Sequence, residues 1–255
     1  MARNLRFSTQ PLPEPNIAMD LLEPGRESTP FADTDPARPL SREDLQHGGR
    51  RDAYVRRLLG GRAWSDRQLH ESLQQTLARG PGGDLWIFAY GSLIWNPLFP
   101  VAEERVARVH GLHRSFCIWS RIGRGSPEQP GLVLGLDRGG NCVGVVLRLE
   151  ERHVADELAL VWRREMVTGA YRPTWVRART AAGVVDAITF VADRKADGYA
   201  GNLTEAEVAA ILARGGGFLG TCSEYLAQTA RGLAARGIRD DGLRRLARHC
   251  ACGDD

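Results

Sequence analysis

Long apolar segments are missing from this sequence of 255 residues. No run of about 18 apolar residues occurs, so the sequence predicts no membrane-spanning helix. Residues 1–15 also lack the apolar stretch that a secretory signal needs. We therefore expect a cytoplasmic protein without membrane insertion.

Cysteine is scarce, and its spacing follows no metal or disulfide pattern. The five cysteines are odd in number and include no C-x-x-C pair, which argues against a disulfide framework and against a zinc site. The segment from His249 to Cys252 contains residue types that bind metals, but a frayed chain end is the simpler interpretation. We predict no bound metal.

A large excess of positive charge is also missing. The formal net charge is +3, and the arginines are scattered along the chain instead of forming a block, so neither observation favours a nucleic-acid partner. With 43% apolar and 25% charged residues, the composition is that of an ordinary globular protein. We expect one folded domain with a tail, and the sequence indicates no oligomeric state.

Proline is concentrated at the beginning of the chain. Seven of the 13 prolines fall within residues 1–40, where no apolar period is visible, so we predict an extended or disordered arm there. Residues 41–83 are expected to form a helical lead-in, and residues 84–250 the main domain. Two pairs in the lead-in have the capping-box spacing of helix starts: Ser41 with Asp44, and Ser65 with Gln68.

Short apolar segments typical of β-strands dominate after residue 84. The first predicted strands cover residues 85–90, 104–111, 115–120, 132–136 and 143–149. The last two flank Asp137–Asn141, which we interpret as a hairpin loop because it is rich in turn residues. A second hairpin is predicted around Ala181–Gly183.

Helical patterns follow mainly in the later part of the chain. One helix is predicted at about 151–166 and three more within 204–250. The residues expected to start or stop the last three helices are Thr204, Thr221, Asp240, Gly215 and Gly237. Antiparallel strands followed mostly by helices favour an α+β fold in which the sheet curls toward a barrel.

Glu165 stands out because of its position on a predicted helix. At 100° per residue it falls on the same face as Val154, Leu158 and Val161, so a carboxylate would point inward. Burial and the nearby helix C-terminus would both raise its pKa, which suits a proton shuttle. The alternative is that the helix ends earlier and Glu165 pairs with a nearby arginine in a solvated rim.

A second feature is the segment Ala89–Trp95, which follows an apolar strand. Gly91 lacks a Cβ, so backbone amides there could approach an anion, and the Ser92 hydroxyl adds a donor. The spacing differs from the G-x-S-x-G nucleophile elbow, so we do not interpret Ser92 as a nucleophile. Taken alone, such a Gly-Ser pair is more often a simple turn.

Together these segments resemble a known family. The resemblance to the ChaC-like glutathione-specific γ-glutamylcyclotransferases extends from about Leu85 to Leu246 and rests on four ordered motifs: Tyr90–Trp95, Arg114–Ser120, Pro130–Leu136, and Trp162–Met166 with Thr168–Pro173. It implies a small mixed β-barrel with flanking helices, within the α+β class. It also implies conversion of glutathione to 5-oxoproline and cysteinylglycine, without a cofactor.

The resemblance also implies roles for individual residues. Glu165 would be the catalytic acid and base, and the 90–94 turn would hold the γ-glutamyl group. Arg114 is a candidate partner for a substrate carboxylate, with a structural ion pair as the alternative. The residues expected to bind substrate are Ala89, Tyr90, Gly91, Ser92, Leu93, Ile94, Arg114 and Tyr225. A core or rim tyrosine is the alternative for Tyr225, and for Tyr199 it is the preferred interpretation.

One segment departs from the family pattern. Where the family has a histidine or an aromatic residue before Arg-Gly, this chain has Ile122-Gly123 before Arg124. Contacts to the glycine end of glutathione are therefore expected to differ. Two other functions remain open: cyclotransfer of other γ-glutamyl amides, which the same fold would serve, and non-enzymatic regulation of cation transport.

Overall fold

The computed structural model describes residues 63–121, 123–150, 152 and 154–251. The predicted arm at 1–40 and the predicted helix start at Ser41 lie outside the described residues. Within the described part of the chain, no helix is both long and apolar enough to cross a membrane.

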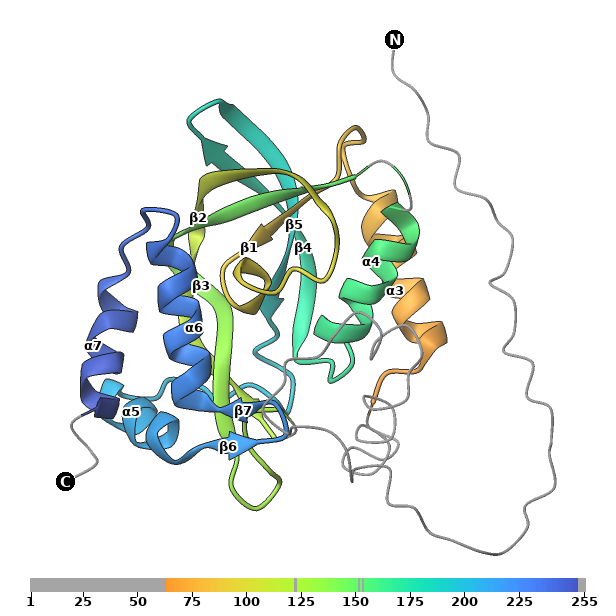
Figure 1. Ribbon diagram of the computed structural model, residues 1–255. Coiled ribbons are helices and arrows are strands. Elements are labelled where there is room, and N and C mark those ends of the chain that lie inside the picture. Colours follow the sequence, from red (N-terminus) through yellow and green to blue (C-terminus); the bar gives the residue numbers. More distant parts are fainter. Residues whose placement is uncertain (1–62, 122, 151, 153, 252–255) are drawn as a thin grey trace, which may run out of the picture.

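Five strands close into a barrel in the order β1-β3-β2-β4-β5 (Figure 1). The strands are β1 (Trp86–Ala89), β2 (Val101–Ser120), β3 (Gly131–Leu149), β4 (Tyr171–Thr180) and β5 (Gly183–Ala192). Neighbours pair antiparallel except where β5 meets β1 and β3, with which it pairs in parallel. The barrel is therefore mixed, and the predicted α+β barrel is confirmed.

The loop predicted at Asp137–Asn141 is wrong. These residues belong to the single long strand β3, which pairs with β2 from end to end, and β2 likewise joins two of the predicted strands. The register shifts between His110 and Leu112, opposite this segment, and Gly139 and Gly140 have positive φ. The turn residues form a β-bulge, at which the two long strands bend. Glycines with positive φ occur in bulges as well as in hairpin loops, so the same residues fit both structures.

The second predicted hairpin is confirmed. Strands β4 and β5 pair from Tyr171 with Ala192 to Thr180 with Gly183, leaving a two-residue connection. Gly183 has φ 123°, a conformation that residues with a Cβ rarely adopt. Tyr171, at the other end of β4 from this connection, follows closely after the helix that ends at Glu165.

Two groups of helices flank the barrel (Figure 1). On one side, α3 (Asp66–Ala78) lies beside α4 (Val154–Glu165), and the Trp162 indole donates to Ser72 Oγ at 3.3 Å. On the other side lie α5 (Glu205–Arg214), α6 (Cys222–Ala234) and α7 (Asp241–Ala251). A short hairpin, β6 (Gly216–Gly217) and β7 (Gly220–Thr221), joins α5 to α6. Helix η2 (Ser92–Ile94) follows β1.

The predicted helix starts at Ser65, Thr204, Thr221 and Asp240 are confirmed, as is the stop at Gly215, whereas α6 ends at Ala234, before the predicted stop at Gly237. Capping boxes begin α3 at Ser65, α5 at Thr204 and α6 at Thr221. Asp240 accepts from the Leu243 amide at 2.9 Å at the start of α7. These caps satisfy backbone donors that have no partner inside the helix, and this fixes where each helix starts.

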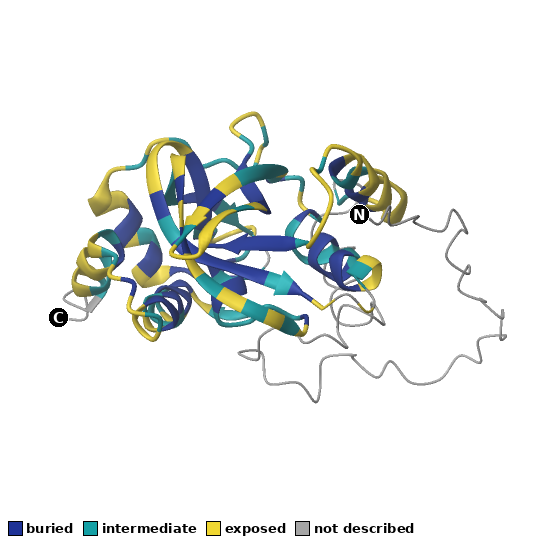
Figure 2. Cartoon of the chain, turned by 90° about the horizontal axis from the view of Figure 1, so that it is seen from above, coloured by how far each residue is buried: buried dark blue, intermediate teal, exposed yellow. Residues whose placement is uncertain are grey.

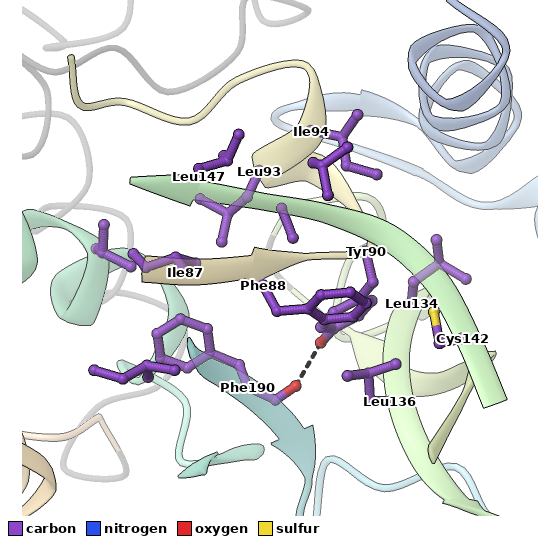
Figure 3. Packing of buried hydrophobic residues seen from close by; sticks show 14 of the residues in the cluster. Ile87, Phe88, Tyr90, Leu93, Ile94, Leu134, Leu136, Cys142, Leu147 and Phe190 are labelled. Atoms are coloured by element: carbon purple, nitrogen blue, oxygen red, sulfur yellow. Dashed lines mark hydrogen bonds between the residues drawn. The ribbon is translucent and has the colours of Figure 1, made fainter. Parts of the chain in front are cut away.

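The core fills the barrel and continues under the helices. Every residue of β1 is buried, which explains why this strand has an uninterrupted apolar sequence. Burial follows the barrel interior and the inward faces of the helices (Figure 2). At the end of β1, Tyr90 reaches across the core and donates to the Phe190 carbonyl at 2.6 Å (Figure 3). This bond fixes the position where the chain leaves the barrel.

Candidate active site

A cavity of about 230 Å³ opens where β1 ends. Its wall comes from segments far apart in the sequence: the turn after β1, the end of β2, the first half of β3, the end of α4, the start of β4 and the β6–β7 hairpin with α6. Such a volume accommodates a small molecule. The barrel thus gathers into one place several of the segments that carry the family resemblance.

Glu165 is the last residue of α4 and lines this cavity. Its side chain is 13% exposed, and Oε1 is buried without a hydrogen-bond partner. Arg164 Nε lies 3.1 Å from that oxygen, close enough for an ion pair. The predicted inward direction is confirmed: the helix does not end before residue 165, and the arginine pair lies inside the cavity instead of in a solvated rim.

Two opposing effects act on the Glu165 carboxyl. Burial raises its pKa above the ordinary value, and the positive charge of Arg164 lowers it. Burial is the larger effect, so the net pKa is raised. A raised pKa makes a carboxylate a stronger base, which suits a group that has to accept a proton and release it again.

The turn from Tyr90 to Leu93 forms the wall beside Glu165. A Cβ on Gly91 would lie 3.0 Å from the Tyr225 hydroxyl, so a larger residue here would have to displace that side chain slightly. Arg164 donates to Ser92 Oγ. The Ile94 amide donates to the Gly91 carbonyl at 3.0 Å, which removes it from the predicted anion donors.

Two other members of the predicted turn lie away from the cavity. Ala89 is fully buried in β1, and Ile94 is buried against α6, where its side chain would contact a Cβ at Gly232. Neither lines the cavity. The structure therefore brings Tyr90, Gly91 and Ser92 to the candidate site, together with Leu93, and leaves the residues that flank them in the core.

Three tyrosines surround the carboxylate. Burial is the main cause that raises the pKa of Tyr90 and Tyr171 well above the ordinary value and that of Tyr225 to about 12; the charge of Glu165 contributes. All three phenols are neutral donors at physiological pH. The sequence analysis missed Tyr171 as an individual site residue, although it lies within one of the segments that carry the resemblance.

The β3 backbone fixes two of these phenols. Tyr171 donates to the Leu134 carbonyl at 2.8 Å, and the Leu134 backbone also hydrogen-bonds Tyr225. Tyr225 lines the cavity, and its predicted contact with the substrate remains a prediction. Tyr199 does not line the cavity; its hydroxyl donates to Asp137 at 2.7 Å, which agrees with the preferred structural interpretation.

Arg114 has the structural role that was its alternative. Its guanidinium donates to the carbonyls of Tyr90 at 2.6 Å and Val143 at 2.8 Å, and it forms an ion pair with Asp240. It does not line the cavity. Arg114 therefore supports the turn from behind, because it holds the carbonyl of Tyr90.

Arg124 is a residue that the sequence analysis did not assign to the site. It lines the cavity, is 5% exposed, and lies over the Tyr225 ring at 5.7 Å. Its guanidinium donates to the Thr221 carbonyl at 3.1 Å and pairs with Glu224 at 3.7 Å. Arg124 thereby joins the end of β2 to the start of α6.

Positive charge prevails in the wall of the cavity. Four arginines line it, and Glu165 is the one carboxylate among the described lining residues. The arginines are Arg121, Arg124, Arg163 and Arg164. A cavity with this charge favours an anionic small molecule, and the segment that departs from the family pattern contributes Arg121, Gly123 and Arg124.

The family model described as ChaC-like protein matches residues 85–251. The chain belongs to the ChaC-like protein family. One similar relative is the glutathione-specific γ-glutamylcyclotransferase of Escherichia coli, 41% identical over 185 residues, which cover 72% of this chain and 80% of the relative. Glutathione-specific γ-glutamylcyclotransferase 1 of mouse is 34% identical over 164 residues, covering 62% of this chain and 74% of that protein.

Solved structures resemble this ChaC-like protein in fold. A crystal structure of the glutathione-specific γ-glutamylcyclotransferase from yeast gives a TM-score of 0.62 at 20% identity, covering 67% of this chain and 97% of the yeast chain. A second crystal structure of the yeast enzyme gives a TM-score of 0.59 at 21% identity. These similarities establish that this chain has the γ-glutamylcyclotransferase fold.

Proposed function

We propose that this chain is a glutathione-specific γ-glutamylcyclotransferase, which converts glutathione to 5-oxoproline and cysteinylglycine. The observation that carries the proposal is the position of Glu165 in the cavity beside the Tyr90–Leu93 turn: its carboxylate is mostly buried, and Oε1 has an ion-pair partner in Arg164 but no hydrogen-bond partner. The names of the similar relatives support the choice of substrate, and the excess of arginine suits a peptide that carries two carboxylates.

The substrate supplies its own nucleophile. The α-amine of a γ-glutamyl group reaches the γ-carbonyl carbon and closes a five-membered lactam. Orientation of an intramolecular reaction of this kind lowers the barrier by about 7–11 kcal/mol. The protein therefore has to fold the glutamyl group into the reactive conformation and manage two protons.

Glu165 is proposed to move both protons. As a carboxylate it accepts one proton from the α-ammonium, and the free amine then attacks the γ-carbonyl carbon. When the C–N bond to cysteine breaks, the carboxylic acid gives this proton to the departing nitrogen. The regenerated carboxylate then takes the second proton from the ring nitrogen, which leaves the neutral lactam, and passes it to the released amine. Burial raises the pKa of Glu165, which makes the carboxylate a better proton acceptor than an exposed one, while the charge of Arg164 opposes this rise.

The turn and the phenols are proposed to hold the reacting groups. The amides and hydroxyl near Ser92 would bind the α-carboxylate. The neutral phenol of Tyr225 lines the cavity with Glu165 and would donate to the negative charge that develops on the γ-carbonyl oxygen. Tyr171 already donates its single proton to the Leu134 carbonyl, so it supports the cavity wall instead.

The direct test uses the full chain with glutathione, followed by detection of 5-oxoproline and cysteinylglycine. Glu165→Gln keeps the size of the side chain but cannot shuttle a proton, and we expect it to lower kcat by about 10²–10⁴-fold. Glu71→Gln is the matched control, because Glu71 is 51% exposed on α3 and does not line the cavity. Retained turnover in Glu165→Gln would contradict the proposal.

The selectivity for glutathione is tested with a panel of γ-glutamyl compounds. Glutathione should have a higher kcat/KM than γ-glutamyl amides that lack the second carboxylate, since the arginines favour anionic groups. Equal kcat/KM values across the panel would limit the proposal to γ-glutamylcyclotransfer in general. The cytoplasmic location inferred from the sequence remains a prediction.

A further inference from the structure

Arg164 makes three different contacts with its three guanidinium nitrogens. Nε lies 3.1 Å from Glu165 Oε1, Nη1 donates to the Asn96 carbonyl at 2.6 Å, and Nη2 donates to Ser92 Oγ. The side chain is 11% exposed and lines the cavity. One side chain therefore connects the carboxylate at the end of α4 to the turn that follows β1.

We propose that Arg164 is a positioning residue for the reaction: it fixes the turn that receives the γ-glutamyl group, and it keeps Glu165 ionised until the substrate ammonium arrives. This inference rests on the proposed function of the same cavity. It gives Arg164 two separable roles. Holding the turn depends on the planar geometry of the guanidinium group, and keeping Glu165 ionised depends on its charge.

The other cavity arginines have different partners. Arg163 lies 3.6 Å from Asp66 of α3. Arg124 donates to the Thr221 carbonyl and pairs with Glu224. Neither contributes to the pKa of Glu165, whose one charged influence is Arg164. Among the arginines that line the cavity, Arg164 is thus placed to control the state of the carboxylate.

The remaining titratable groups that face Glu165 are the phenols of Tyr90, Tyr171 and Tyr225, from the turn after β1, from β4 and from α6. Their pKa values are raised, so they stay neutral across the physiological pH range. Arg164 therefore supplies the charge that opposes the burial of Glu165. Without it, the carboxyl would take up a proton at a higher pH and would no longer be ready to accept one.

The test compares Arg164→Gln with Arg164→Lys. Gln removes both the charge and the guanidinium donors that hold the turn. We therefore expect kcat/KM for glutathione to fall about 100-fold, a loss typical of a misplaced reacting group. The acid limb of the kcat/KM profile, which reports the free enzyme, should move up by about one pH unit or more. Lys keeps the charge, so the acid limb should stay near its original pH while kcat/KM remains low.

Arg172→Gln is the matched control. Arg172 is the second residue of β4; its side chain is 51% exposed, lies 3.9 Å from Asp193 and does not line the cavity. The control should leave the acid limb where it is, and thermal unfolding should show that all variants are folded. The inference is overturned if Arg164→Gln leaves the acid limb unchanged, or if its kinetics match those of Arg172→Gln.

A second measurement separates this inference from the proposed function. Carbon-13 NMR titration of the Glu165 carboxyl in the wild-type protein and in Arg164→Gln needs no turnover. Absence of 5-oxoproline from wild-type protein would contradict the proposed function alone. A Glu165 pKa that does not rise in Arg164→Gln would contradict the role of Arg164, whether or not glutathione is consumed.

Discussion

Glu165 should make the folded protein less stable at neutral pH, so Glu165→Gln should gain stability while losing the proposed activity. Oε1 is buried without a hydrogen-bond partner, and an unsatisfied buried polar atom costs about 1–3 kcal/mol. The contact with Arg164 at 3.1 Å offsets part of that cost. We expect the variant to be more stable by about 1–2 kcal/mol, which corresponds to a Tm increase of about 2–8 °C.

The difference should depend on pH, because burial raises the pKa of Glu165 above its ordinary value of 4.5. Below that value the carboxyl is protonated in both the folded and the unfolded protein, so the pH-dependent difference vanishes. Between the ordinary and the raised pKa, the unfolded protein loses this proton while the folded protein keeps it. In this range the free energy of unfolding of the wild type falls by about 1.4 kcal/mol per unit of rising pH relative to the variant. Above the raised pKa the difference is constant.

The assay is urea unfolding of the wild type, Glu165→Gln and the Glu71→Gln control between about pH 4 and pH 8. Equal slopes against urea would show that all three expose similar surface on unfolding, so that midpoints report stability. The control should follow the wild type, because Glu71 is 51% exposed. A Glu165→Gln difference that is the same at every pH, or a wild type that is the more stable protein at neutral pH, would refute the reasoning.

Two further substitutions test other parts of the structure. Gly91→Ala would place a Cβ 3.0 Å from the Tyr225 hydroxyl, so it should lower the free energy of unfolding by about 1–3 kcal/mol. Tyr225→Phe removes that hydroxyl and should recover part of the loss in the double variant. Strictly additive losses would show that the two residues do not contact each other. Asp137→Asn should cost about 1–3 kcal/mol, because the buried carboxylate accepts from Arg194 at 2.6 Å and Tyr199 at 2.7 Å; an unchanged urea midpoint would contradict this.

Local patterns in the sequence predicted the elements whose signals lie within a few residues. The capping boxes at Ser65, Thr204 and Thr221 each involve a side chain and an amide three residues apart, so the helix starts could be predicted. The bulge at Gly139 and Gly140 could not be recognised in this way. The same residues form a loop or a bulge depending on whether a partner strand continues past them, and β2 supplies that strand.

In the candidate site, too, residues whose signal is local could be predicted, and residues placed by distant parts of the chain could not. Glu165 could be predicted because helical phase alone turns it inward. Arg124 could not, since its partner Thr221 lies 97 positions away in the sequence and comes close only when α6 docks on the barrel. Arg114 illustrates the opposite error: its charge suggested a substrate carboxylate, but the fold directs it to backbone carbonyls and Asp240 behind the turn.

The unequal numbers of charges in the cavity bear on the first step of the proposed reaction. The α-carbon of a γ-glutamyl group carries both a carboxylate and an ammonium. The lining arginines attract the carboxylate but repel the ammonium, which lowers the pKa of the amine and favours its deprotonation. A second acid beside Glu165 would stabilise the ammonium instead and would oppose this step. One carboxylate among several cations is therefore the arrangement that both binds the substrate and releases its nucleophile.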